Sequence, residues 1–162
     1  MNRTLIALVE DKPGVLTRVA SLFRRRAFNI ESLTVGHTEQ PGVSRMTIVV
    51  DSDRTDVQKV AQNLCKLVNV IQVKDVTGQP AVMRDLALIR VQANGGARSE
   101  VMQLVDTFRA RVVDVSLDTL MVEVTGTEEK VEGLVEVLRP FGVLEMVRTG
   151  RVAMVRGGNG VS

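Results

Sequence analysis

The sequence predicts an α+β protein made of two consecutive units, each with the strand and helix order βαββαβ. Short apolar runs of strand length alternate along the chain with segments in which apolar residues recur at helical spacing. The second half repeats the first, because Phe23 corresponds to Phe108 and Ile30 to Val115 at the same separation. We therefore expect two four-stranded antiparallel sheets, each with its helices on one face.

The first unit, residues 3–77, opens with a strand at residues 4–9, which is a continuous apolar run. The segment Asp11-Lys12-Pro13-Gly14 breaks this strand, and a helix is expected from Val15 through the arginines at 24–26. Proline or glycine suits a first helical turn, and the arginines complement the negative end of the helix dipole.

A hairpin, a second helix and a last strand complete the first unit. Residues 29–38 and 44–51 are the expected arms of the hairpin, joined by a turn at Gln40-Pro41-Gly42. The next helix is expected from Thr55, because Thr55-Asp56-Val57-Gln58 has the spacing of a capping box. Residues 68–76 are the expected fourth strand.

The second unit, residues 81–156, follows a linker at Gly78-Gln79-Pro80 and repeats this order. Its helices are expected to begin at the N-caps Ser99 and Thr127. The resulting βαββαβ order is that of a ferredoxin-like unit. Residues 157–162 are expected to form a disordered tail. The strands of the second unit are expected at residues 85–91, 112–115, 119–124 and 143–148.

Composition excludes several function classes. The 162 residues include one Cys and one His, so the chain can form neither an internal disulfide nor a Cys₂His₂ zinc site. Twenty-one basic against nineteen acidic residues leave a net charge of +2, which gives no reason to expect a nucleic-acid partner. No apolar run has the length of a membrane span, and we expect a cytoplasmic protein without a signal segment or membrane partner.

The strands carry apolar residues at successive positions, which point to both faces of the sheet, as in Leu5-Ile6-Ala7-Leu8-Val9 and Thr47-Ile48-Val49-Val50. A sheet with helices on one face and water on the other buries alternate residues, so this pattern indicates that the second face is covered too. Small domains are marginally stable alone, so we expect burial against another copy or another domain. We predict a homodimer paired through edge strands or sheet faces.

No constellation in the sequence has the pattern of an active site. Glu10 and Asp11 are adjacent at a strand end and point to opposite sides, so they cannot bracket one bond. His37 is interpreted as an exposed loop residue in preference to a catalytic one. Asn94-Gly95-Gly96 could cradle a phosphate ahead of a helix, but we favour an ordinary loop. We therefore expect no catalytic residue and no metal site in this chain.

The loop after the first strand is more informative. The free N–H groups of the first helical turn point outward at the positive end of the helix dipole, and Gly14 lets a ligand approach the backbone. These groups would hold a small carboxylate, and Asp11 is placed to meet an ammonium group. A free amino acid carries both groups. Taken alone, the loop favours an ordinary strand–helix turn over such a site.

Longer segments resemble known families. The run Asp-Lys-Pro-Gly-Val-Leu at residues 11–16, placed after a strand in a βαββαβ frame, resembles the ACT domain, a family of amino-acid-sensing modules. The run Arg-Ala-Phe-Asn-Ile-Glu-Ser-Leu-Thr-Val at 26–35, followed by Ser-Arg-Met-Thr-Ile at 44–48, strongly resembles the regulatory small subunit of acetolactate synthase. This resemblance covers nearly the whole chain, with residues 3–77 as the ACT domain.

The resemblance implies a function without catalysis in this chain. In that family the catalytic large subunit holds thiamine diphosphate, Mg²⁺ and FAD, and it catalyses the first common step of valine, leucine and isoleucine synthesis. The small subunit carries none of these cofactors; it activates the large subunit and confers feedback inhibition by valine. Its ACT domains dimerise and bind valine at their interface. In this chain the implied effector residues are Asp11, Gly14, Val15 and Leu16, with Gly36 nearby on the hairpin, and with Asn29 and Ile30 from the partner chain.

Three further expectations accompany this reading. Many members of the family have Asn where this chain has Asp11, and Asp can accept from an ammonium group but cannot donate. Arg24, Arg25 and Arg26 could contact the large subunit, although a solvated helix end is the favoured alternative. The remaining alternatives are a stand-alone ACT-type sensor that regulates a different enzyme and, with less support, a small ferredoxin-like enzyme such as an acyl phosphate hydrolase.

Overall fold

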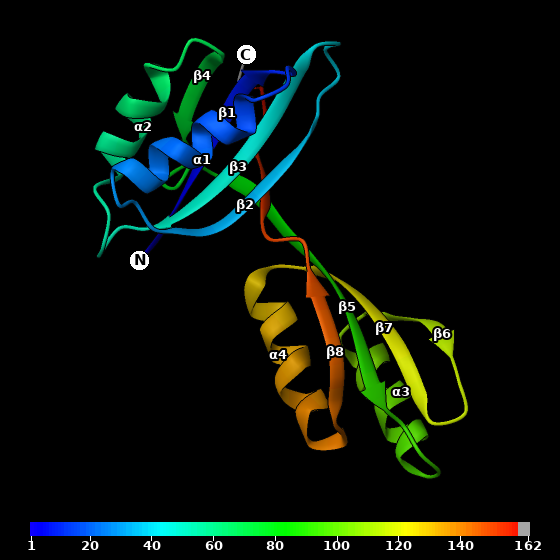
Figure 1. Ribbon diagram of the computed structural model, residues 1–162. Helices are drawn as coiled ribbons and strands as arrows, with labels where there is room; N and C mark the ends of the chain where they lie inside the picture. The colour runs from blue at the N-terminus through cyan, green and yellow to red at the C-terminus, as the bar shows by residue number, and fades with distance from the viewer. Residues whose placement is uncertain (159–162) are drawn as a thin grey trace. The chain divides into compact units, whose positions relative to one another are not determined.

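The computed structural model describes residues 1–158 and divides into two compact units (Figure 1). Among the described residues, the first unit comprises Met1–Val82 together with residues 151–158, and the second is Met83–Gly150. The second unit is therefore shorter than the expected 81–156, because the residues after Gly150 return to the first unit. Of the expected tail, Gly157 and Gly158 form a turn, and residues 159–162 lie outside the described part of the chain.

The first unit has the predicted βαββαβ order and one antiparallel sheet. Its strands are ordered β2-β3-β1-β4, so β2 and β4 are the edges. Helices α1 and α2 pack on one face of this sheet (Figure 1). Its elements are β1 (Asn2–Glu10), α1 (Val15–Arg25), β2 (Ile30–His37), β3 (Val43–Asp51), α2 (Val57–Cys65) and β4 (Val70–Asp75).

Alternation along β1 builds the core of this unit. Leu5, Ala7 and Val9 face the helices and are almost completely buried. The register pairs Leu5 with Ile48 of β3, which is fully buried on the same face. Each such side chain removed from water contributes on the order of 2 kcal/mol to stability.

The start of α2 differs by one residue from the expectation. Asp56, not Thr55, is the N-cap, and its side chain accepts hydrogen bonds from the backbone N–H groups of Gln58 and Lys59. The Thr55 hydroxyl instead accepts from the backbone N–H of Asn29 at 3.3 Å. Thr55 therefore joins the start of β2 to the loop before α2.

The second unit repeats the order, with an antiparallel path β6-β7-β5-β8. Thr127 caps α4 as predicted, because its hydroxyl accepts from the N–H of Lys130. Helix α3 begins at Ala97, so Ser99 lies inside its first turn and is not the cap. The elements are β5 (Ala81–Gln92), α3 (Ala97–Thr107), β6 (Arg111–Val115), β7 (Thr119–Gly126), α4 (Glu128–Leu138), the 3₁₀ turn η1 (Arg139–Phe141) and β8 (Val143–Arg148).

A ninth strand, β9 (Val152–Val155), was not predicted; it pairs with β5 and groups with the first unit. Its Ala153 is buried, and the carbonyl of Ala153 accepts a hydrogen bond from Arg45 of β3. On the outer face of the first sheet, Ile6 and Val49 are also buried within the single chain. The second face predicted to be covered is thus covered in part by the chain itself. No helix among the described residues is long and apolar enough to cross a membrane.

Candidate functional site

The loop between β1 and α1 is fixed by backbone hydrogen bonds at both ends. The N–H of Asp11 donates to the carbonyl of Gly42 at 2.9 Å, and the N–H of Arg18 donates to the carbonyl of Gly14 at 3.0 Å. Gly14 is the residue before the helix and has φ +86°, a left-handed conformation that a residue with a side chain adopts at a cost. A Cβ built at Gly14 would meet no atom within 4 Å, so the space beside it is open.

The first turn of α1 leaves donors exposed. The N–H groups of Leu16 and Thr17 have no acceptor within the part of the chain that the structure describes, and both residues are exposed. No side chain caps this helix, in contrast to α2 and α4. Backbone donors and the positive end of the dipole therefore meet at an open surface, which is suited to a small carboxylate.

The C-terminal end of β2 lies beside the loop between β1 and α1. His37 Nδ1 lies 3.2 Å from Asp11 Oδ2, and the two side chains are 84% and 45% exposed. Gly36 precedes His37 on the strand, so a single chain brings Asp11, Gly14–Leu16 and Gly36 to one end of the sheet. The expectation that His37 is exposed is confirmed, and its contact with Asp11 was not foreseen.

Asn29 and Ile30 lie at the other end of β2. Ile30 pairs with Val50, whereas His37 pairs with Ser44, so the strand separates them. At about 3.3 Å per residue, roughly 20 Å lies between the two ends. One chain therefore does not bring Asn29 and Ile30 to the loop.

Asn69 supports the loop from the opposite side. Its side chain donates to Glu10 Oε2 at 2.9 Å and accepts from Arg18 Nη1 at 2.5 Å, and its backbone carbonyl accepts from the Glu10 N–H. The hydrogen bond from Asn69, followed by that from Lys12, lowers the pKa of the Glu10 carboxyl. The loop thus begins from a fixed, ionised strand end.

A basic patch lies at the C-terminal ends of the two helices of the first unit. Arg24 and Arg25 end α1, Arg26 follows, and all three are exposed. Within residues 1–158 none of them forms an ion pair. Lys66, which follows α2, lines the same hollow as Arg25 and Arg26. We call these four residues the basic patch; the sequence did not indicate that Lys66 belongs to it.

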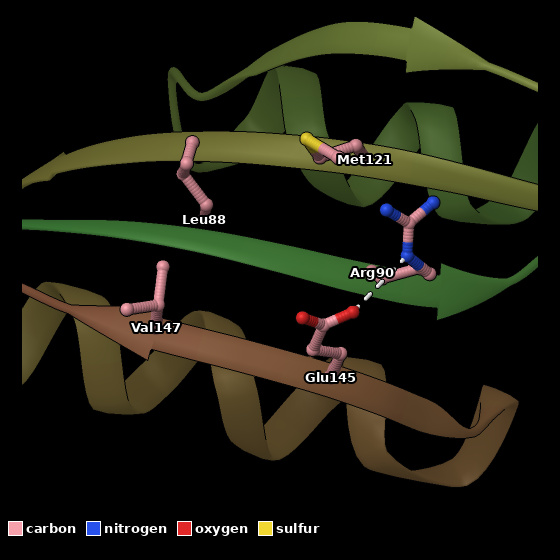
Figure 2. A pocket seen from close by; sticks show the side chains of 5 residues that line it. All are labelled: Leu88, Arg90, Met121, Glu145 and Val147. Atoms are coloured by element: carbon pink, nitrogen blue, oxygen red, sulfur yellow. Dashed lines mark ion pairs between the residues drawn. The ribbon is translucent and has the colours of Figure 1, made fainter.

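The outer face of the second sheet is partly apolar (Figure 2). Leu88, Met121 and Val147 come from three neighbouring strands and line a shallow hollow. Arg90 and Glu145 line the same hollow and form an ion pair at 3.5 Å. This pair satisfies the charges of the hollow, so it presents mainly its apolar side chains.

Within residues 1–158 there is no group of three or more His, Cys, Asp or Glu side chains that could hold a metal ion. Glu10 contacts Lys12 and Asn69, and Asp11 contacts the exposed His37, so neither carboxylate lies against a second carboxylate. Exposed backbone donors and a carboxylate at one end of the sheet are groups that suit a small zwitterion.

Comparison with known proteins gives the same family over both units. A family model described as the small subunit of acetolactate synthase matches residues 84–157, and one described as an AHAS small subunit-like ACT domain matches residues 5–72. A probable acetolactate synthase small subunit from Archaeoglobus fulgidus is 54% identical over 97% of this chain and 98% of its own length. The acetolactate synthase small subunit of Mycobacterium leprae is 54% identical over 99% and 95%.

A solved structure agrees in fold. The crystal structure of the acetolactate synthase small subunit from Thermotoga maritima has a TM-score of 0.89 and 40% identity, and the match covers 97% of this chain and 98% of that one. Both the fold and the order of the two units are therefore shared along the full length of that protein.

Proposed function

This chain belongs to the acetolactate synthase small-subunit family, and we propose that it activates the catalytic large subunit and makes it sensitive to valine. Branched-chain amino acid synthesis is the pathway of the family. On this proposal the chain works in the cytoplasm and is not an enzyme by itself. Thiamine diphosphate, Mg²⁺ and FAD belong to the large subunit, and valine is the ligand of this chain.

The observation that carries the proposal is the open end of α1. A valine carboxylate would accept from the exposed N–H groups of Leu16 and Thr17, with Gly14 and Val15 giving it room against the backbone. Its ammonium group would meet the Asp11 carboxylate, which is held near this point by His37. Charge-assisted hydrogen bonds of this kind are roughly twice as strong as neutral ones.

The rest of the site is proposed to come from a second copy of the chain. β2 is an edge strand that pairs with β3 alone in the described sheet, and an exposed edge of eight residues is a template for pairing. Antiparallel pairing of β2 with the partner's β2 about a two-fold axis places opposite strand ends side by side. Asn29 and Ile30 of the partner subunit would then lie beside Gly36 and complete the site.

Such a shared site explains how valine could inhibit. A ligand shifts an equilibrium only by its difference in affinity for two arrangements. A molecule that contacts both chains binds one relative placement of them better than another. Valine therefore favours the low-activity arrangement if that arrangement has the better-formed site.

The basic patch is proposed as a contact with the large subunit. Its arginines have no partner of opposite charge in the described chain, and charge complementarity across an interface steers association. The stand-alone sensor that regulates a different enzyme remains the alternative; the match of the second unit to the small-subunit model favours acetolactate synthase as the target.

The test is reconstitution with the catalytic large subunit. The two chains should co-purify, the mixture should form acetolactate faster than the large subunit alone, and valine should remove that gain. If the complex forms and is more active than the large subunit alone but is not inhibited by valine, the proposed activation stands and the proposed valine sensitivity is contradicted.

A further inference from the structure

The outer face of the first sheet, opposite its helices, carries a hollow of about 170 Å³ between β2, β3 and β9. Since one water occupies about 30 Å³ of liquid, this is room for roughly five waters or for a molecule of a few carbon atoms. Its lining includes Thr34, Gly36, Arg45, Thr47 and Val152.

The hollow exists because Gly36 stands opposite Arg45 in the β2–β3 register. Paired residues of neighbouring strands point to the same face, so a side chain at Gly36 would cover the stem of Arg45. A Cβ built at Gly36 would meet no atom within 4 Å. Gly36 lies at the end of β2 near the loop at Gly14, and it also lines this hollow.

Arg45 is a partly buried cation that forms no ion pair among the described residues, although the Glu39 carboxylate is near enough to interact with its charge. Its Nη2 donates to the carbonyl of Ala153 at 2.6 Å, and no carboxylate of the described residues lies within ion-pair distance of it. Burial lowers the pKa of its guanidinium. Two other partly buried arginines do have a carboxylate partner, because Arg3 pairs with Asp75 and Arg148 pairs with Asp85. Arg98, like Arg45, donates to backbone carbonyls.

A guanidinium has five N–H donors in a planar fork that matches a carboxylate. The donors of Arg45 that Ala153 does not use remain for an anion, and a partly buried cation gains most from one. The hydroxyls of Thr34 and Thr47 add polar groups, and Val152 adds an apolar wall. No Asp or Glu lines the hollow, so nothing there selects for an ammonium group.

We propose that this hollow binds a small monocarboxylate with a short apolar tail, whose carboxylate pairs with Arg45. An ammonium group is not required, so a 2-oxo acid fits as well as an amino acid. The hollow adjoins the loop at Gly14, because His37 lines it and contacts Asp11, but its ligand group is Arg45 and not the backbone donors and carboxylate of the loop. The proposal therefore stands or falls independently of valine binding at that loop.

The test is a binding titration of the full-length chain with three probes: 3-methyl-2-oxobutanoate, valine and isobutylamine. The 2-oxo acid should bind saturably to the wild type and to Gly14→Asp, and isobutylamine should not bind. Arg45→Gln should weaken binding of the 2-oxo acid by about tenfold or more, since a charge-assisted bond is lost. Arg45→Lys, which keeps the charge, should lose less.

Arg151→Gln is the matched control. Arg151 donates to the Thr4 hydroxyl at 3.0 Å and so contacts the same sheet beside β9, but it does not line the hollow. It should leave the affinity within about twofold. The proposal is overturned if the wild type binds no 2-oxo acid, if Gly14→Asp abolishes that binding while Arg45→Gln does not, or if Arg151→Gln and Arg45→Gln weaken it equally. Loss of valine binding in Gly14→Asp, together with unchanged binding of the 2-oxo acid, would support two distinct ligand sites.

Discussion

His37 Nδ1 lies 3.2 Å from Asp11 Oδ2, which joins the end of β2 to the loop before α1. The Asp11 carboxylate is the group proposed to receive the ammonium of valine. A positive charge at His37 therefore competes with the ligand for the same carboxylate, and a neutral side chain there does not.

We predict opposite effects from two substitutions of His37. His37→Lys places a permanent cation beside Asp11 and should raise the valine concentration for half-inhibition several-fold. His37→Gln has no charge and should leave that concentration unchanged or lower it. Acetolactate assays of the reconstituted complex give both values; a similar loss for the two variants would mean that the ring itself, not its charge, matters.

Asn69→Ala should destabilise the first unit. The side chain of Asn69 joins Glu10 to Arg18, and its loss leaves both without that partner. The expected loss is about 1–2 kcal/mol in the free energy of unfolding, measured by urea denaturation. Val68→Ala, at the exposed neighbouring position, is the control and should change it little.

The same variant should change how Glu10 titrates. The hydrogen bond from Asn69 is the main cause that lowers the pKa of Glu10 in the folded chain. The ionised carboxylate therefore stabilises the fold at pH values above the pKa of an ordinary glutamate. This stabilisation is lost as the pH falls through the lowered pKa of the folded chain. Asn69→Ala should move the pKa of Glu10 upward, toward the ordinary value. An NMR titration of the Glu10 side chain that shows no upward movement would contradict this account.

The dimer is predicted to pair through the edge strand β2. Val35 of β2 and Ile71 of β4 are exposed apolar residues on the two opposite edges of the same sheet. Val35→Lys should weaken the dimer by about tenfold or more in sedimentation equilibrium, because an apolar contact at the paired edge is replaced by a charged side chain that favours water. Ile71→Lys is the matched control; dissociation by Ile71→Lys alone would assign the interface to β4.

The basic patch is predicted to contact the large subunit. Arg25→Glu combined with Arg26→Glu should weaken the complex and flatten its dependence on salt, because screened attraction becomes repulsion. Arg111→Glu reverses the charge of an exposed arginine in the second unit and should have little effect. If the double variant and Arg111→Glu bind the large subunit with equal affinity in a pull-down titration, Arg24–Arg26 are a solvated helix end and not a contact.

Local patterns were enough to predict most of the elements. The βαββαβ order and the cap at Thr127 are confirmed because alternation, helical spacing and capping are local properties of the chain. The cap of α2 was misplaced by one residue because Thr55 and Asp56 are both good caps, and the choice depends on the distant Asn29 N–H. β9 was missed because it has four residues and follows the end of the repeated pattern.

The candidate site was predictable only in part. The loop at Gly14 carries its own signal, since proline, glycine and a helix start coincide. The contact of His37 with Asp11 depends on the register of β2, and the contact of Arg45 with Ala153 depends on the pairing of β9 with the first unit. Neither can be predicted from a local sequence pattern. In the proposed dimer Asn29 and Ile30 would join the site from a second copy, which a single chain does not contain.

Valine inhibition of the complex formed with Gly14→Asp, compared with Gly14→Asn, tests the central claim most directly. Both side chains meet the same open space and tolerate a left-handed backbone similarly, so they differ in charge. We predict that the Asp variant still activates the large subunit but needs at least about tenfold more valine, because its carboxylate repels that of the ligand, while the Asn variant stays within about threefold of the wild type. Equal valine sensitivity in the two variants would contradict carboxylate binding at the start of α1.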